Sequence, residues 1–189
     1  MSVENFYGLE GLDGVGKTTT RETLKEKGHI VLKTPPDSFP ISRKRYDNLG
    51  VNSRFLFYLA GVVWAGDEAK KIVKTKRVIC DRYLLTTVSA HEAMGLHPVI
   101  LKSASALMKK IPVPENTFLL IVSDEERLRR LNERGSNDVD VANLKINDKI
   151  LSGYRKWAKK LEHQLTEIDT TNMTPNQVVE CIEDNIFSK

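Results

Sequence analysis

The stretch Gly11-Leu12-Asp13-Gly14-Val15-Gly16-Lys17-Thr18 constrains this chain more than any other part of its sequence. It has the phosphate-loop spacing of a glycine, four residues and then Gly-Lys-Thr. Glycines let the backbone curl so that successive N–H groups point at one anion, Lys17 reaches the outer phosphates, and the Thr18 hydroxyl is suited to Mg²⁺. The apolar run 6–9 predicts a strand before the loop, and residues 19–27 predict a helix whose positive end adds to the anion site. These flanks argue against an ordinary glycine-rich turn.

Short apolar runs alternate with helical patterns along the whole chain. The predicted strands are 6–9, 29–33, 77–81, 117–122 and 165–169, and the predicted helices are 19–27, 52–75, 86–94, 98–109, 123–133, 141–164 and 175–187. This alternation predicts an α/β fold of the P-loop three-layer type, with a parallel sheet of about five strands and helices on both faces. No linker divides the chain, so we expect one domain over residues 1–189 with a short lid at about 134–140.

Composition and charge exclude several classes of protein. The net charge of +4 suits a phosphate ligand but does not argue for nucleic acid. The first residues lack the basic and apolar regions of a signal peptide, and no apolar run is long enough to span a membrane. Cys80 and Cys181 make no disulfide framework. We therefore expect a cytoplasmic location, with no nucleic-acid or membrane partner.

Asp81 ends a predicted strand and Arg82 follows it, so both should lie at the carboxyl edge of the sheet, where such folds bind ligands. An aspartate there can orient Mg²⁺ together with Thr18. A guanidinium can bridge two phosphates and spread the charge of the group that is transferred. The simpler explanations are a carboxylate that caps a turn and an arginine in a surface salt bridge.

Four arginines lie on the helix before the expected lid. Arg127 and Arg129 are expected to pair in solvent with the acidic residues 124–126. Arg130 and Arg134 border the polar break, where either side chain can clamp a nucleotide when the lid closes.

The first half of the 52–75 helix is apolar nearly all round, which predicts deep burial. Tyr58 on this helix is therefore either a core residue or, if it faces the loop edge, a platform on which a base stacks.

With these motifs in place, the chain resembles the thymidylate kinase family of nucleoside monophosphate kinases over most of its length. Residues 10–19, Glu-Gly-Leu-Asp-Gly-Val-Gly-Lys-Thr-Thr, are similar to the family's Glu-Gly-x-Asp-Gly-x-Gly-Lys-Thr-Thr loop. Asp81-Arg82-Tyr83 with Thr86 is similar to its Asp-Arg-Tyr-x-x-Ser, and 126–135 looks like its helix leading into the lid. Ile168-Asp169, before Pro175 and Val178, sits where the family turns around adenine.

The resemblance implies a transferase of nucleotide biosynthesis that moves the γ-phosphoryl group of ATP, with Mg²⁺, to a nucleoside monophosphate. Asp13 would contact the region of the acceptor's 3′-hydroxyl, and Arg82 would hold the acceptor phosphate beside the γ-phosphate. Arg43 or Arg45 would be the family's other phosphate-holding arginine. The implied catalytic residues are Lys17, Arg82, Asp13 and Arg134. The implied nucleotide-binding residues are Gly11, Asp13, Gly14, Val15, Gly16, Lys17, Thr18, Thr19, Arg130 and Arg134, with Thr18 and Asp81 for the metal ion.

The acceptor base stays open at this point. Tyr58 falls where the family stacks an aromatic ring on that base, and Tyr154 falls where a tyrosine approaches the base or the sugar. Four residues beyond Tyr58, however, Val62 replaces the arginine that reads thymine, and 34–38 and 89–91 also depart from the family pattern. Thr34-Pro35-Pro36 and the Phe57-Tyr58 helix look more like the divergent mitochondrial UMP–CMP kinase branch. The resemblance also allows a homodimer through the apolar helix 55–64.

Three other functions remain to be weighed. A nucleoside or small-hydroxyl kinase would need a base, for which Asp13, Glu10 or Asp81 is available. A GTPase-like switch would need Asn-Lys-x-Asp to read guanine, and Asn147-Asp148-Lys149 has the wrong order. The intact Lys17, Thr18, Asp81 and Arg82 argue against a catalytically dead regulatory homologue.

Overall fold

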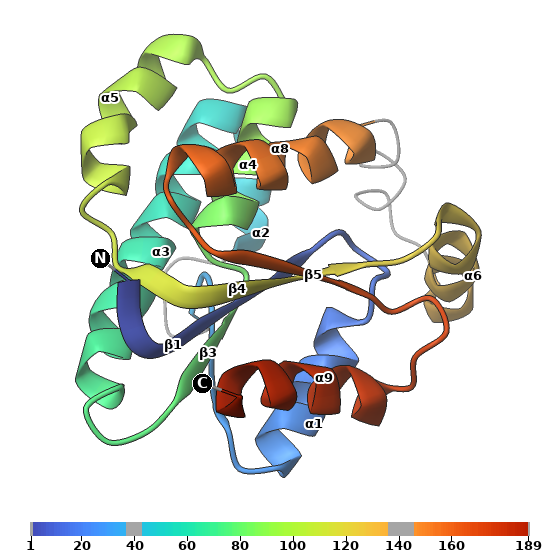
Figure 1. The fold of residues 1–189 in the computed structure, drawn as a ribbon. Coiled ribbons are helices and arrows are strands. Elements are labelled where there is room, and N and C mark those ends of the chain that lie inside the picture. Colours follow the sequence, from blue (N-terminus) through green and yellow to red (C-terminus); the bar gives the residue numbers. More distant parts are fainter. Residues whose placement is uncertain (1, 37–42, 136–145, 189) are drawn as a thin grey trace.

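The computed structural model describes residues 2–36, 43–135 and 146–188. A parallel sheet of five strands, in the order β2-β3-β1-β4-β5, runs through the middle of the molecule (Figure 1). The strands are β1 (Ser2–Gly11), β2 (Ile30–Lys33), β3 (Val78–Asp81), β4 (Val113–Ile121) and β5 (Leu165–Asp169). The expected fold class is confirmed. Leu9 of β1 pairs with Asp81 of β3, so the phosphate loop and the Asp81-Arg82 segment leave neighbouring strands at the same edge.

Helices cover both faces of the sheet (Figure 1). They are α1 (Lys17–Glu26), α2 (Arg43–Asp47), α3 (Val51–Ile72), α4 (Leu84–Ala93), α5 (Pro98–Met108), α6 (Asp124–Arg134), α8 (Asn147–Lys160) and α9 (Pro175–Phe187). Helices α1 and α9 lie on one face, and α3, α4, α5 and α8 lie on the other.

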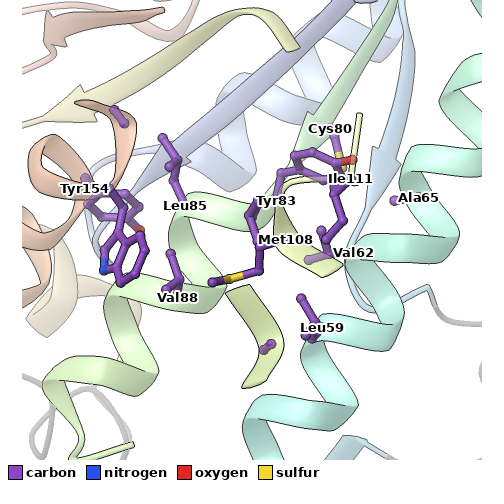
Figure 2. Packing of buried hydrophobic residues seen from close by; sticks show 14 of the residues in the cluster. Leu59, Val62, Ala65, Cys80, Tyr83, Leu85, Val88, Met108, Ile111 and Tyr154 are labelled. Carbon is purple, nitrogen blue, oxygen red and sulfur yellow. The ribbon is translucent and has the colours of Figure 1, made fainter. Parts of the chain in front are cut away.

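Alternation along β1 divides the core between these two layers, because successive side chains of a strand point to opposite faces. Phe6 joins the cluster under α3, α4 and α8, whereas Tyr7 and Leu9 join the cluster under α1 and α9. Figure 2 shows the first cluster, where Leu59 of α3 lies on one side, Tyr154 of α8 on the other, and Val88 of α4 between them. The site edge is thus anchored from both faces of the sheet.

Several expected bounds were wrong by a few residues. Helix α4 begins at Leu84 rather than 86, because a buried carboxylate from β1 caps its first turn, as described below. The expected helix 141–164 is observed as Asn147–Lys160, and 141–145 lie outside the described residues. The prediction that the first half of α3 is buried nearly all round was also wrong, since Leu56 is 52% exposed. Within the described ranges, no helix is long and apolar enough to cross a membrane.

Candidate active site

The phosphate loop forms a tight backbone cradle at the end of β1. Gly14 and Gly16 have φ angles of 87° and 98°, in the left-handed region that side chains disfavour. A Cβ on Gly11 would lie 2.6 Å from the Leu120 carbonyl oxygen, so this position has no room for a side chain. Gly16 is the N-cap of α1 and no side chain caps the helix. The N–H groups of its first turn are therefore available to an anion.

Lys17 lies inside this cradle and is 6% exposed. Its Nζ donates to the carbonyl oxygen of Leu12, within the loop itself. Burial lowers the pKa of Lys17 to about 7, helped by the charge on Arg82 and opposed by Asp13 and Asp81. A carbonyl oxygen carries no full negative charge, so a phosphate is a better partner for this buried ammonium.

Arg82 lies across the cradle from Lys17 and has a left-handed φ of 61°. Its backbone N–H donates to the Leu9 carbonyl oxygen at 3.0 Å, and its guanidinium is ion-paired with Asp13. Burial acts to raise the pKa of Asp13, but the charges of Arg82 and Lys17 outweigh it and the pKa is lowered. Asp13 is thus a carboxylate that holds the arginine over the loop.

Glu10 is completely buried and binds the backbone that follows Arg82. Its Oε1 accepts the backbone N–H groups of Tyr83 at 3.0 Å and Thr86 at 3.2 Å, and its Oε2 accepts the Thr86 hydroxyl. Burial raises the pKa of Glu10 although these hydrogen bonds act to lower it. Because the carboxylate is saturated with donors, its role is to fix the start of α4, and it is badly placed to act as a base.

Asp81 and Thr18 lie on the wall of the same site and fit a divalent cation. Asp81 is 5% exposed, and its Oδ2 accepts from Nη1 of Arg21 at 2.9 Å. Its Oδ1 is buried without a hydrogen-bond partner among the described residues, and Thr18 is exposed to the cavity. An unsatisfied carboxylate oxygen and a hydroxyl on the wall of one cavity are oxygen donors of the kind that Mg²⁺ prefers.

A cavity of about 710 Å³ joins these groups. Lys17 and Arg82 both line it, which confirms that the cradle and the arginine face one space. Its lining residues are Asp13, Gly14, Gly16, Lys17, Thr18, Thr19, Arg21, Lys33, Asp81, Arg82, Arg130, Glu133 and Arg134. The space between the cradle and the arginine is open to a ligand.

A second cavity of about 370 Å³ continues from the first, since Gly16, Thr19 and Arg130 line both. Pro175 and Val178 of α9 form part of its apolar wall. Arg130 is held there by Glu126 at 2.7 Å and by the Thr170 carbonyl oxygen at 2.8 Å. The two cavities together accommodate a ligand with phosphates at one end and a flat apolar group at the other.

The two tyrosines differ in their surroundings. Tyr58 is half-buried, donates to Asp47 Oδ1 at 2.8 Å, and its ring lies 5.4 Å from that of His91. Tyr154 is fully buried, and its hydroxyl lies 2.8 Å from Thr86 Oγ1. Tyr154 also lines a small cavity of about 40 Å³ that reaches the Asp13–Arg82 pair. Contact between either ring and an acceptor stays a prediction.

The predicted arginines also differ in their surroundings. Arg45 is exposed on α2, and the side chain of Arg43 lies outside the described residues, as does 136–140 of the expected lid. Arg129 pairs in solvent with Glu126, as expected, and also with Glu133. The expectation that Arg127 lies in solvent was wrong: it pairs with Asp124 but is 6% exposed, because α6 packs it against Gly14 of the loop.

Two residues of the site were not predicted from the sequence. Arg21 is four residues after Lys17, on the same face of α1, a spacing that placed it near the loop but could not reveal its bond to Asp81. Lys33 ends β2 beside Asp81 in the register of the sheet, a position that only the strand order discloses.

The parallel sheet, the cradle with its buried lysine and the arginine across the cavity define a P-loop phosphotransferase. The thymidylate kinase family model matches residues 9–182, and the chain belongs to that family. The chain is therefore a nucleoside monophosphate kinase, with ATP as its phosphoryl donor and small-molecule nucleotides as its substrates.

Curated relatives are similar over most of both chains. A probable thymidylate kinase of Pyrococcus abyssi is 31% identical over 172 residues, 82% of each chain. A thymidylate kinase of Leptospira interrogans is 29% identical over 206 residues, 97% of this chain and 96% of the relative.

Solved structures support the fold. Thymidylate kinase from Candida albicans matches with a TM-score of 0.78 at 20% identity, over 98% of this chain and 92% of that one. A deoxyadenosine kinase from M. mycoides matches with a TM-score of 0.70 at 16% identity, over 97% and 100%. Since kinases of both kinds share this fold, the acceptor must be argued from the site.

Proposed function

We propose that this enzyme phosphorylates dTMP or another pyrimidine nucleoside monophosphate, with Mg²⁺ bound by Thr18 and Asp81. The observation that carries the proposal is the single cavity lined by both Lys17 and Arg82, with Asp13 holding Arg82 in place. An anionic acceptor at Arg82 and the donor's γ-phosphate at Lys17 would share this space.

The chain's own groups act mainly by positioning and by neutralising charge, which is where phosphoryl transfer gains most of its rate. The loop amides and Lys17 bind the donor's β- and γ-phosphates, and Arg82 binds the acceptor phosphate. Arg130 and the wall at Pro175 bind the donor's base end. Mg²⁺, when bound, supplies charge neutralisation between the donor phosphates. A phosphate acceptor is already a nucleophile, so no strong base is required.

A hydroxyl acceptor is less well supported by the same residues. It needs a general base, but Glu10 is occupied by donors from α4 and Asp13 is ion-paired with Arg82. Asp81 is likewise bonded to Arg21. The site therefore favours a phosphate acceptor over a nucleoside.

The test is a coupled ADP-release assay over the common nucleosides and nucleoside monophosphates, with the wild type and with Arg82→Ala. We expect turnover of pyrimidine monophosphates and a loss of kcat/KM in Arg82→Ala of about 10²- to 10³-fold, as for a removed transition-state donor. Arg155→Ala is the matched control, because Arg155 is half-exposed and pairs with Glu167 away from the cavity. Activity confined to nucleosides, or full activity in Arg82→Ala, would contradict the proposal.

We further propose a homodimer through α3, supported by the exposed Leu56 in the apolar first half of this helix. The cytoplasmic location and the lack of nucleic-acid and membrane partners stay predictions.

A further inference from the structure

We propose that Arg21 is a second phosphate-binding arginine on the acceptor side of the cavity. Asp81 holds it while the site is empty, and a divalent cation that binds Asp81 releases it to the acceptor's phosphate. This inference rests on the proposed function, because it requires an acceptor that carries a phosphate.

The starting state is visible in the hydrogen bonds of Asp81. Nη1 of Arg21 lies 2.9 Å from Oδ2 of Asp81, and the two side chains are 18% and 7% exposed. Oδ1 of the same carboxylate is buried and has no hydrogen-bond partner within the described residues. Within the described residues, one oxygen of Asp81 is thus bound to Arg21 and the other has a free coordination position.

The position of Arg21 follows from the strand order. Helix α6, with Arg130 and Arg134, follows β4 on one side of β1, whereas Asp81 and Lys33 end β3 and β2 on its other side. Arg21 lines the large cavity together with Asp81 and Lys33. It thus lies at the end of the cavity away from α6, on the same side of the loop as the segment that carries Arg82.

The charges at the site explain why Arg21 would be recruited. The guanidinium of Arg82 is ion-paired with Asp13, and Arg130 is held by Glu126 and Thr170 at the donor end. A monophosphate brought next to the donor's phosphates needs more positive charge than Arg82 supplies alone. A divalent cation at Asp81 replaces the single charge of Arg21, so the guanidinium can turn to a phosphate, its preferred bidentate partner.

This exchange couples the cation to the acceptor. Nη1 of Arg21 is bound to Asp81 without the cation and available with it, while Nε stays paired with Oε1 of Glu22 at 2.7 Å. Adding Mg²⁺ should therefore tighten acceptor binding through the Nη1 end of Arg21. Coupling of this kind is reciprocal and can be measured by binding alone. A purely structural Arg21–Asp81 pair would give no such dependence.

The experiment compares Arg21→Gln and Arg21→Lys with the wild type. Lys25→Gln is the matched control, because Lys25 lies one turn further along α1, is exposed, and is absent from the described residues that line the large cavity. Steady-state kinetics give the KM values of dTMP and ATP separately. Thermal shift measures dTMP binding to the ADP-bound protein, once with Mg²⁺ and once with EDTA.

We expect Arg21→Gln to raise the KM of dTMP about 10- to 100-fold, the loss typical of a charge-assisted hydrogen bond, with the KM of ATP within about twofold. Mg²⁺ should increase the dTMP-induced shift in the wild type and in Lys25→Gln, but not in Arg21→Gln. Arg21→Lys, which keeps the charge, should recover part of both effects.

Two negative results are distinguishable. If the wild type turns over dTMP and Arg21→Gln keeps the same KM for dTMP, or loses ATP binding instead, the inference is overturned and the proposed function stands. If the wild type neither binds nor phosphorylates any monophosphate, the proposed function fails and this inference fails with it. The melting temperatures of the ligand-free variants show that each one is folded.

Discussion

Replacing Glu10 tests whether a buried carboxylate on β1 fixes the start of α4 beside Arg82. The side chain accepts three hydrogen bonds, two from backbone N–H groups and one from a hydroxyl, in a fully buried position. Glu10→Ala leaves the N–H groups of Tyr83 and Thr86 without their acceptor, and each unsatisfied group costs roughly 1–3 kcal/mol. We expect the variant to lose about 4 kcal/mol of the free energy of unfolding.

Glu10→Gln separates hydrogen bonding from charge. The amide oxygen can still accept the two N–H groups, and the Thr86 hydroxyl can rotate to accept from the amide nitrogen. The buried charge is removed as well, so we expect a loss of only about 1 kcal/mol. Glu4→Ala is the control on the same strand, where the exposed side chain predicts a change within about 0.5 kcal/mol.

Urea unfolding followed by circular dichroism measures all three variants without nucleotide. Because Glu10 orients the segment that carries Arg82, Glu10→Ala should also lower kcat in the ADP-release assay. A loss below about 1 kcal/mol for Glu10→Ala, or equal losses for the alanine and glutamine variants, would refute the capping role.

Two further predictions concern Lys17 and α3. The pKa of Lys17 is lowered to about 7 by burial, so the side chain is mostly neutral at pH 8. Because bound phosphates raise this pKa, ADP binding should take up a proton. ADP affinity should therefore weaken as the pH rises above 7. Calorimetry in buffers of different ionisation enthalpy measures this uptake, and uptake that persists in Lys17→Met would contradict it. Leu56→Glu should make the protein monomeric at nearly unchanged stability, as measured by light scattering and by thermal unfolding. Leu128→Glu, at a similarly exposed leucine of α6, should leave the dimer intact. A wild type that is already monomeric would exclude the dimer.

The sequence predicted the parts of the site that depend on local spacing. The phosphate loop, the Asp81-Arg82 segment and the alternation of strands and helices are read from neighbouring residues, and the sheet confirms their arrangement. Strand ends on adjacent parallel strands necessarily share one edge.

The parts that escaped prediction depend on partners distant in the chain. Glu10 meets Thr86 76 residues away, and Arg21 meets Asp81 60 residues away. Arg127 has the spacing of a surface arginine, and only the packing of α6 on the loop buries it. Spacing along one helix cannot reveal which other element covers it.

The bond from the Arg82 N–H to the Leu9 carbonyl oxygen joins the two segments that hold the cavity. Because β1 and β3 are also paired in register up to Leu9 and Asp81, the backbones beneath Lys17 and Arg82 form one rigid body. Closure over a substrate cannot shorten the distance between these backbones and must come from elements outside the β1–β3 pair. The enzyme would then set the separation of its two phosphate sites when it folds, before any nucleotide arrives.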